Sequence, residues 1–461
     1  MEYQPRTADD LLDQKLAASA AVLVEGAKWC GKTTTAARHA QSVLYMQDPD
    51  RLRQNLEMAD LAPSRLLAGD VPRLLDEWQL APVLWDAVRF EADRRGECGQ
   101  FVLTGSAVPP DPSSMHHTGT GRISRLVMRP MSLFESGDSD GSVSLSALFG
   151  DGRTTGEPDE AGGDTPGGVD APGDEDAPGE MDASGGVGSS ADVEGYSDAE
   201  VGDIARLVCR GGWPGSLRLT EKSALDVPGE YLEAVISADV SRVDGVTRDA
   251  ERVRQLLRAC ARATASQTSL ASIRRDMLSA DSPALSEDTV QSYAAALRKI
   301  FVLEDSPAWN PNLRSKTAIR TSATRYFTDP SLAVAALGAG PDALLADLET
   351  LGLLFENLCV RDLRVYAQAA GGEVCHYRDR NGLECDAVVR LADGRYGLVE
   401  VKLGGEDAVE AGAVALLKLA RAIDTQSMPS PSFRMVVTAK GGYARCRADG
   451  VLVVPITCLG A

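Results

Sequence analysis

The segment GAKWCGKT, from Gly26 to Thr33, has the composition and spacing of a phosphate-binding loop. It follows the apolar run AAVLVEG and precedes the helical pattern KTTTAARHAQSVL, so we expect it to connect a buried strand to a helix. Glycine lets the backbone wrap around phosphate, and the amides at a helix N-terminus supply positive potential. Lys32 can reach the β- and γ-phosphates, and the Thr33 hydroxyl can bind Mg²⁺. The residues predicted to bind nucleotide are Gly26, Cys30, Gly31, Lys32, Thr33 and Thr34.

Two further predicted strands end in polar residues that suit nucleotide hydrolysis. VPRLLDE ends in Asp76 and Glu77, and QFVLTGS ends in Thr104 and Ser106. Asp76 suits a water-mediated contact to Mg²⁺, whereas Glu77 suits a base that positions the attacking water. A hydroxyl group from Thr104 or Ser106 can sense the γ-phosphate. The sequence therefore predicts a hydrolytic site whose metal is held by Thr33 and Asp76.

Arg122 and Arg125 follow in the segment GTGRISRLVMRPMSLFE. A cation from the same chain or from a neighbouring subunit can stabilise charge on a transferring phosphoryl group. Arginine is also common on exposed surfaces, so a catalytic and a merely solvated role both stay open for each residue.

Near the C-terminus, charged residues follow one another at a spacing that suits phosphodiester chemistry. Asp386 lies in the predicted strand LECDAVVRL, and Glu400 and Lys402 lie at positions i and i+2 of the predicted strand YGLVEVKLG. Glu400 and Lys402 therefore share one face of their strand, and the hairpin LADGRYG brings Asp386 near Glu400. Glu356 precedes them on a predicted helix, within the apolar stretch GLLFENLCV, where a carboxylate needs a partner.

Carboxylates in this order can hold Mg²⁺ or Mn²⁺, which polarises a phosphate and lowers the pKa of a bound water. We predict Asp386 and Glu400 as metal ligands of a nuclease-type site that also uses Glu356 and Lys402. A Glu-x-Lys pair on an exposed strand usually has no function. The complete order of helix acid, strand acid, hairpin and Glu-x-Lys favours the nuclease-type fold.

Three helical patterns between about 250 and 302, followed by two short predicted strands, have the order of a winged helix. Ser286 is the predicted cap of the third helix. The segment is locally basic through Arg274, Arg275, Arg298, Lys299, Arg314, Lys316, Arg320 and Arg325. Contact with DNA through residues 250–330 and a solvated helical spacer are both consistent with this pattern.

Charge and composition set one segment apart from the rest of the chain. The 461 residues carry a formal net charge of −20, and residues 151–200 hold 15 acids and one base, Arg153, so only −6 remains elsewhere. We predict a disordered acidic Gly/Pro-rich insertion over 137–198, because such a composition buries too little apolar surface to offset its ordering entropy. An acidic arm that recruits a partner or mimics nucleic acid is the alternative.

The remaining composition predicts a cytoplasmic protein with reduced thiols. Nine scattered cysteines form no Cys-x-x-Cys pair and, with four histidines, no zinc spacing. The first residues, MEYQPRTADD, lack the pattern of a signal peptide, and no apolar run approaches the roughly 20 residues that span a bilayer.

The motifs YQPR, VLVEGAKWCGKTTTA, LLDEWQ, FVLTGS, GRISRLVMRPMSLFE, GGWPGSL, RYFTDPSLA, GLLFENL, ECDAVV and VEVKL occur in an order that resembles a prokaryotic family of AAA-type ATPases. Members of that family carry a P-loop domain, a winged-helix segment and a C-terminal domain of unknown function similar to the PD-(D/E)xK nuclease fold. The resemblance implies ATP as the nucleotide, with Lys32, Thr33, Asp76 and Glu77 as the ATPase residues.

The expected fold is therefore α/β, with three parts. An AAA-type ATPase domain is expected over 1–136 with a helical continuation over about 199–245, a winged-helix-like domain over 246–335, and a restriction-endonuclease-like α/β domain over 336–461. The expected function is an ATPase that couples nucleotide state to a nuclease-like, DNA-handling module. A nucleotide-dependent regulatory switch, or a defence or toxin–antitoxin component with an inactive nuclease fold, is the alternative. The expected partners are ATP, DNA, further copies of the chain and a protein that the sequence does not identify, with no membrane.

Overall fold

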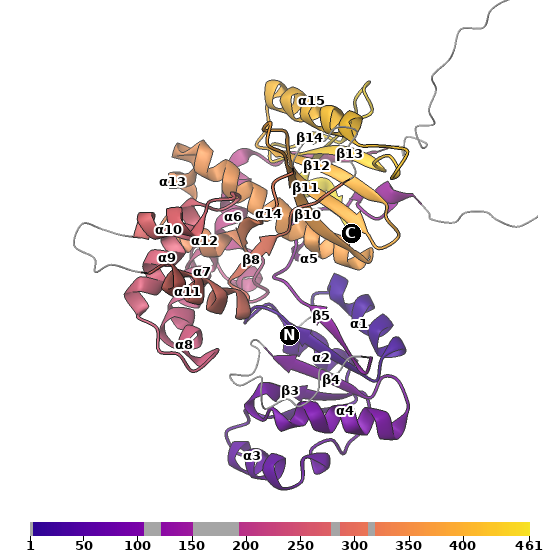
Figure 1. Cartoon of the computed structure of the whole chain (residues 1–461), viewed down its shortest axis with the longest axis vertical. Coiled ribbons are helices and arrows are strands. Elements are labelled where there is room, and N and C mark those ends of the chain that lie inside the picture. Colours follow the sequence, from indigo (N-terminus) through magenta and orange to yellow (C-terminus); the bar gives the residue numbers. More distant parts are fainter. Residues whose placement is uncertain (1–2, 106–120, 151–192, 278–285, 312–318) are drawn as a thin grey trace, which may run out of the picture.

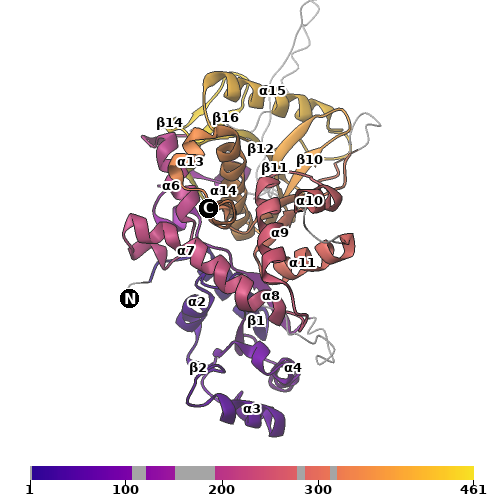
Figure 2. The same cartoon turned by 90° about the vertical axis from the view of Figure 1, so that its left-hand side faces the viewer.

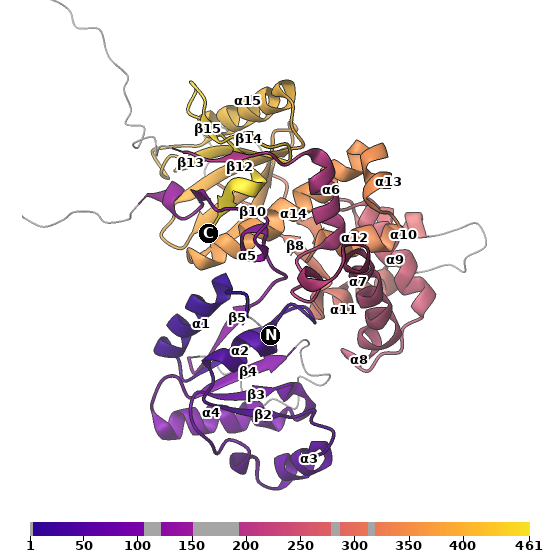
Figure 3. The same cartoon turned by 180° about the vertical axis from the view of Figure 1, so that it is seen from behind.

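The computed structural model describes residues 3–105, 121–150, 193–277, 286–311 and 319–461. A parallel sheet lies at one end of the molecule, a mixed sheet lies at the other, and a helical region lies to one side of both (Figure 1). The long helix α14 (Leu348–Ala369) runs between these parts (Figures 1 and 3). None of the helices in these ranges has the length and apolar character needed to cross a membrane. None of the nine cysteines, all of which lie in these ranges, forms a disulfide.

The N-terminal sheet is parallel throughout, in the order β2-β3-β4-β1-β5. Its strands are β1 (Ala21–Glu25), β2 (Ser42–Tyr45), β3 (Arg73–Asp76), β4 (Phe101–Gly105) and β5 (Ile123–Val127), and its helices are α1 (Thr7–Ala18), α2 (Lys32–His39), α3 (Leu52–Leu61) and α4 (Val83–Arg95). Alternate residues of β1 enter different cores: Val22 and Val24 belong to one cluster, Ala21 and Leu23 to another. Because side chains alternate along a strand, this sheet is buried on both faces.

Two elements of this sheet differ from the sequence prediction. The helix after the P-loop ends at His39, and the following residues, predicted as its last turn, form the strand β2. The Gln41 N–H donates to Pro72 O at 2.8 Å, and β2 then pairs with β3. β5 was not predicted; it buries Ile123 and Leu126 in different cores and exposes only Arg125 fully.

The middle of the chain is mostly helical. Its elements are α6 (Val201–Arg210), α7 (Glu221–Ala234), the π-helix η6 (Val235–Asp239), α8 (Val240–Arg242), α9 (Ala250–Arg262), α10 (Leu270–Met277), α11 (Glu287–Lys299), β8 (Leu303–Ser306), β9 (Thr324–Phe327), α12 (Pro330–Leu337) and α13 (Pro341–Ala346). The three helices α9–α11 precede the antiparallel pair β8–β9, which is the predicted succession. Ser286 caps α11 by accepting from Thr289 N at 3.1 Å. Figure 2 views the molecule from the side of these helices, which lie in front, between the C-terminal sheet above and the N-terminal sheet below.

The C-terminal sheet has the order β10-β11-β12-β13-β16-β15. Its strands are β10 (Gly372–Arg378), β11 (Glu384–Leu391), β12 (Tyr396–Lys402), β13 (Phe433–Thr438), β15 (Arg445–Cys446) and β16 (Leu452–Pro455). β10, β11 and β12 are antiparallel neighbours, whereas β12, β13 and β16 run parallel. The helices α14 and α15 (Glu406–Ala422) pack against its strands. The sequence predicted one helix before this sheet, but the structure has two, α13 and α14. Asp347 separates them and caps α14 by accepting from Thr350 N.

Both ends of the predicted acidic insertion belong to ordered structure, which corrects its bounds. After α5 (Leu133–Ser136), β6 (Val143–Ser144) pairs in parallel with β17 (Leu459–Gly460), and β7 (Tyr196–Ser197) pairs with β14 (Gly442–Tyr443). The run SVSLSALF supplies the buried side chains of Val143, Leu145 and Phe149, which the composition of the wider segment concealed. Residues 151–192 lie outside the described residues.

A buried ion cluster on α14 joins the three parts of the chain. The Arg361 guanidinium lies 2.8 Å from Asp329 and 2.7 Å from Asp362, and all three side chains are at most 1% exposed. Asp362 accepts from Leu133 N at 2.9 Å, and Asp329 accepts from Gly212 N at the same distance. The cluster therefore fixes α5 and the residues after α6 against α14.

A second junction is centred on Glu304 of β8. Its carboxylate pairs with Arg129, which follows β5, at 2.6 Å, and with Arg364 of α14 at 3.5 Å. Arg129 also donates to Gln368 of α14 at 2.7 Å. Burial alone would raise the pKa of Glu304, but the two arginines outweigh burial and lower this pKa to about 2.

We expect Glu304→Gln to destabilise the protein in a pH-dependent way. The unfolded carboxyl group titrates near its ordinary pKa of 4.5, so the ionised folded carboxylate contributes stability above that pH. This contribution is lost as the pH falls from about 4.5 towards 2. The midpoints of thermal unfolding of wild type and variant should therefore be well separated at pH 7 and converge at low pH. A separation that does not change with pH would show that the arginines do not stabilise the charge.

Candidate functional site

The P-loop connects the interior strand β1 to α2, at the carboxyl edge of the parallel sheet. Gly26 has a φ of 151°, and a Cβ atom there would lie 2.0 Å from Met128 O, so only glycine fits. Gly31 has a left-handed φ of 101° and precedes the first residue of α2. Ligands of open α/β sheets bind at this edge, where neighbouring strands connect in opposite directions. The sequence prediction of a strand, loop and helix is confirmed.

Asp76 forms hydrogen bonds with the predicted site residues Thr33 and Thr104, which come from two other segments of the chain. Its Oδ1 atom accepts from Thr33 Oγ1 at 2.8 Å and from Thr104 Oγ1 at 2.5 Å, while Oδ2 accepts from Gln47 at 2.6 Å. Asp76 is 1% exposed. A buried carboxylate beside the P-loop threonine suits the outer coordination of Mg²⁺. Gln47 was not predicted, because it follows the strand β2 that the sequence concealed.

The P-loop offers the donors that a triphosphate needs. The Lys32 ammonium lies inside the loop and donates to Gly26 O at 2.9 Å and to Ala27 O at 2.7 Å. Cys30 is buried, with its thiol directed at Met128 O, whereas Thr34 is exposed at the start of α2. Lys32, the loop amides and the Thr33 hydroxyl therefore fit Mg²⁺ and a nucleoside triphosphate.

Glu77 directly follows β3 and has a left-handed backbone (φ 56°). Its carboxylate accepts a hydrogen bond from Gln79. Burial and the neighbouring Asp76 raise its pKa, which Lys32 partly counteracts. A carboxyl group with a raised pKa beside the phosphate loop suits a base that positions or deprotonates water. Ser106, the other predicted sensor, lies outside the described residues.

Arg122 and Arg125 lie beside and on the edge strand β5, and both pair with acids of the same chain. Arg122 precedes β5, beside the start of β1, and pairs with Asp93 at 2.7 Å. Arg125 lies level with the middle of β1 and pairs with Glu25 at 3.2 Å, with its side chain 57% exposed. Arg122 therefore lies at the end of β1 remote from the P-loop, whereas Glu25, the partner of Arg125, directly precedes Gly26 of the loop. Their action on a neighbouring subunit stays a prediction.

Arg6 contacts the backbone of the P-loop, and no role was predicted for it from the sequence. It donates to Cys30 O at 2.7 Å and to Arg129 O at 2.8 Å. It also pairs with buried Glu135 at 3.1 Å, which in turn accepts from the Ser132 N–H. The loop is thus tied to the segment that leads into α5. The motifs YQPR and LFE at these positions were the available indication.

The four C-terminal residues predicted as a nuclease-type site converge on one place. Lys402 lies 2.6 Å from Glu400 and 3.6 Å from Asp386. Asp386 accepts from Val401 N at 2.8 Å, which holds β11 beside β12 at this point. Glu356 reaches the group from α14, where burial and the neighbouring charge of Asp386 raise the pKa of Glu356.

Burial dominates the electrostatics of this carboxylate site, which we define as Glu356, Asp386, Glu400 and Lys402. Burial and Asp386 raise the pKa of Glu400 to about 8, and they raise the pKa of Glu356 well above its ordinary value. Burial opposes the charge of Lys402, but Asp386 and Glu400 outweigh burial and raise its pKa. The single cation Lys402 therefore faces three acids. A second cation that binds here can replace the protons held by Glu356 and Glu400.

Tyr326 of β9 completes this site from the middle of the chain, and sequence reasoning missed it. Its hydroxyl donates to Glu356 Oε1 at 2.6 Å. The Arg364 guanidinium lies 5.4 Å from the centre of its ring, and Arg364 also holds Glu304. Tyr326 lies in the quoted motif RYFTDPSLA, but no local pattern connects that motif to a helix 30 residues further on.

The fit of a divalent cation to the carboxylate site is partial. Glu400 Oε1 is buried and has no hydrogen-bond partner. The remaining near oxygens of Asp386 and Glu400 face Lys402. The described residues contain no cluster of three or more His, Cys, Asp or Glu side chains arranged to hold a metal. The predicted metal role of Asp386 and Glu400 thus rests on two carboxylates and one unpartnered oxygen.

The described basic residues of the middle region differ in their surroundings. Arg298 pairs with Asp305 at 2.8 Å, and Arg325 is 8% exposed and lies 3.9 Å from the same carboxylate. Arg275, Lys299 and Arg320 are exposed. Arg314 and Lys316 lie outside the described residues. Contact with DNA through this region stays a prediction.

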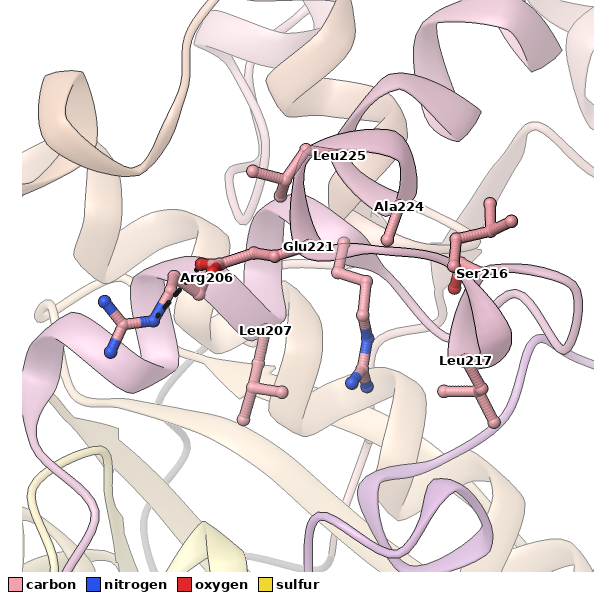
Figure 4. A pocket seen from close by; sticks show the side chains of 9 residues that line it. Arg206, Leu207, Ser216, Leu217, Glu221, Ala224 and Leu225 are labelled. Carbon is pink, nitrogen blue, oxygen red and sulfur yellow. Dashed lines mark ion pairs between the residues drawn. The ribbon is translucent and has the colours of Figure 1, made fainter.

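A separate pocket of about 310 Å³ lies where α6, α7 and the turn at Ser216 meet. Figure 4 shows Leu207, Leu217 and Leu225 among its lining side chains. Arg206 points towards Glu221 across this pocket, 3.8 Å away. The pocket contains none of the predicted site residues.

Three family models match the chain. Residues 18–136 match the model of an AAA domain, residues 201–343 match a domain of unknown function (DUF8612), and residues 351–459 match another domain of unknown function (DUF4143). The N-terminal part is an AAA-type P-loop ATPase domain. A search of curated proteins finds no match. Among solved structures, the Walker-type ATPase PABY2304 of Pyrococcus abyssi matches with 13% identity and a TM-score of 0.37, over 73% of this chain and 99% of that chain.

The Tyr326–Glu356 pair allows a test of whether this carboxyl group is kept for function or for stability. Replacing both partners by apolar groups of similar shape removes two buried polar groups without leaving either unpaired. We therefore expect the double variant Tyr326→Phe, Glu356→Met to unfold at a higher temperature than wild type. Tyr326→Phe alone should cost about 1–3 kcal/mol, because it leaves the carboxyl group unpartnered. A double variant much less stable than both single variants would indicate a structural role.

Proposed function

We propose that the protein hydrolyses ATP at its P-loop and uses the nucleotide cycle to control a phosphodiester-cleaving site in its C-terminal domain. The observation that supports ATP hydrolysis best is the convergence of Thr33 and Thr104 on Asp76, with Glu77 next in the chain. Bound Mg²⁺ would neutralise charge on the β- and γ-phosphates. Lys32 and the loop amides bind those phosphates, and Glu77 orients the water that attacks the γ-phosphate.

The C-terminal proposal is supported by the convergence of three acids and one lysine from α14, β11 and β12. A helix followed by three antiparallel strands, a second helix and parallel strands is the arrangement that the PD-(D/E)xK resemblance implies. A divalent cation held there would polarise a phosphodiester and acidify water. In this site Asp386 and Glu400 bind the cation, Lys402 stabilises charge on the attacked phosphate, and Glu356 with Tyr326 borders the same cluster. DNA is the substrate that we propose.

The two junctions on α14 support communication between these sites. Arg129 and Leu133 follow the last strand of the ATPase sheet, and both contact side chains on α14 or on β8. Glu356 lies on α14, five residues before Arg361. Because the segment after β5 contacts α14 directly, a displacement of this segment can move the helix that carries Glu356.

For the ATPase, we expect Lys32→Ala to abolish ATP binding and Glu77→Gln to preserve it. Glu77→Gln should lower the rate of hydrolysis by about 100-fold or more, as is usual when a general base is removed. Binding is measured by calorimetry and hydrolysis by phosphate release, with Lys222→Gln on exposed α7 as the matched control. Hydrolysis that persists in Lys32→Ala would exclude this P-loop as its source.

For the C-terminal site, we expect the wild type to cleave DNA with Mg²⁺ or Mn²⁺ in the presence of ATP. Glu400→Gln and Lys402→Met should each reduce cleavage by about 100-fold or more while ATP hydrolysis is retained. Asp407→Asn, on the exposed start of α15, is the matched control. Cleavage that survives Glu400→Gln would place the activity elsewhere. A wild type that binds DNA but never cleaves it would favour a nucleotide-dependent switch over a nuclease.

A further inference from the structure

A second lysine of the P-loop is held by the middle region of the chain. Lys28 Nζ lies 2.6 Å from Asp239 Oδ1. Asp239 is the last residue of the π-helix η6, which continues α7. The Lys28 side chain is 45% exposed, whereas the Asp239 side chain is 11% exposed. The carboxylate is thus fixed within the helical region, and the ammonium can leave it.

Aromatic packing fixes the backbone on which Lys28 stands. Trp29 has a left-handed φ of 62°, and its ring meets Tyr231 edge-on at 5.6 Å. Tyr231 in turn stacks on Trp213, with the ring centroids 4.7 Å apart. A left-handed conformation is costly for tryptophan and persists because its surroundings impose it. The loop residues at 28 and 29 are therefore positioned by α7.

Lys28 belongs to the same loop as Lys32, four residues before it. Burial and Asp76 raise the pKa of Glu77, and the charges of Lys32 and Lys28 partly oppose this rise. The neighbouring loop residues Ala27 and Cys30 are buried, so among the loop side chains Lys28 and Trp29 are the exposed pair. The ammonium group of Lys28 is therefore accessible to a ligand bound at the P-loop.

We propose that Lys28 binds the γ-phosphate of ATP and that Asp239 competes with this phosphate for its ammonium group. This inference rests on the proposed ATPase function. A half-exposed ion pair contributes little net free energy, so a γ-phosphate, with its larger negative charge, can displace the carboxylate. ADP has no γ-phosphate and leaves the pair in place. The exchange releases or restrains the end of η6, and π-helical turns of this kind often occur at functional sites.

The test measures binding of ADP and of a non-hydrolysable ATP analogue to the full-length protein by calorimetry. Lys28→Gln should weaken analogue binding about tenfold or more and leave ADP binding nearly unchanged, because only the γ-phosphate loses a charged donor. Asp239→Asn should tighten analogue binding about two- to fivefold by removing the competitor. The double variant should behave like Lys28→Gln, since Asp239 acts only through Lys28.

Two controls and two contrary outcomes make the result decisive. Lys222→Gln and Asp226→Asn alter the same charges at exposed positions of α7 and should change neither affinity. Equal effects of Lys28→Gln on both nucleotides would show that the ion pair serves only the structure of the loop. An Asp239→Asn variant that does not tighten analogue binding would refute the competition. If the wild type binds neither nucleotide, the proposed ATPase function fails, whereas binding that is insensitive to Lys28 overturns this inference alone.

Discussion

The burial of Arg361 is the constraint on which the arrangement of the domains depends. A guanidinium ion this far from water must be paired on every side, because an uncompensated charge in the interior costs several kcal/mol, roughly 3–5 when one partner is removed. Its partners come from different segments: Asp329 precedes α12, and Asp362 is the next residue of α14. These carboxylates also accept from the backbone at Gly212 and Leu133. Buried pairs of this kind add little net stability, but they permit only one geometry.

The same logic extends from α14 to the nucleotide loop. Glu135, on the short helix that begins at Leu133, holds Arg6, and Arg6 holds the carbonyl group of Cys30 in the P-loop. On the other side, Arg129 is bound by Glu304 and Gln368. The segment from 129 to 135 is thus attached at one end to the phosphate loop and at the other to α14. Each attachment is a directional polar contact, which transmits displacement better than apolar packing that can slide.

Sequence reasoning recovered the features that depend on local patterns. Gly26 to Thr33 required a strand and a helix around it, and the spacing of Asp386, Glu400 and Lys402 required a hairpin; both are present. The errors arose where tertiary context overrides local preference. The residues after His39 continue a helical pattern but pair with β3, and the apolar run around Val143 is hidden in an acidic, Gly-rich surrounding but finds a partner in β17.

The residues that were missed share a different cause. Each of them forms its hydrogen bond with a residue far away in the sequence, and nothing in its own segment marks it as functional. These residues are Tyr326, Arg6 and Gln47. Charge patterns were similarly ambiguous. Arg298 and Arg325 contribute to a basic stretch, yet both lie near Asp305. A count of charges along the chain cannot show which of them neutralise one another within the fold.

The middle region, which matches only a domain of unknown function, supplies one residue to each candidate site. Asp239 pairs with Lys28 at the P-loop, and Tyr326 donates to Glu356 at the carboxylate site. The two contacts have opposite character. The first is partly exposed and can be exchanged for a phosphate, whereas the second is buried and short. The middle region can therefore move at the nucleotide site while its contact at the carboxylate site stays rigid. Such a region can convert a change of nucleotide at the P-loop into a change of position at the carboxylate site.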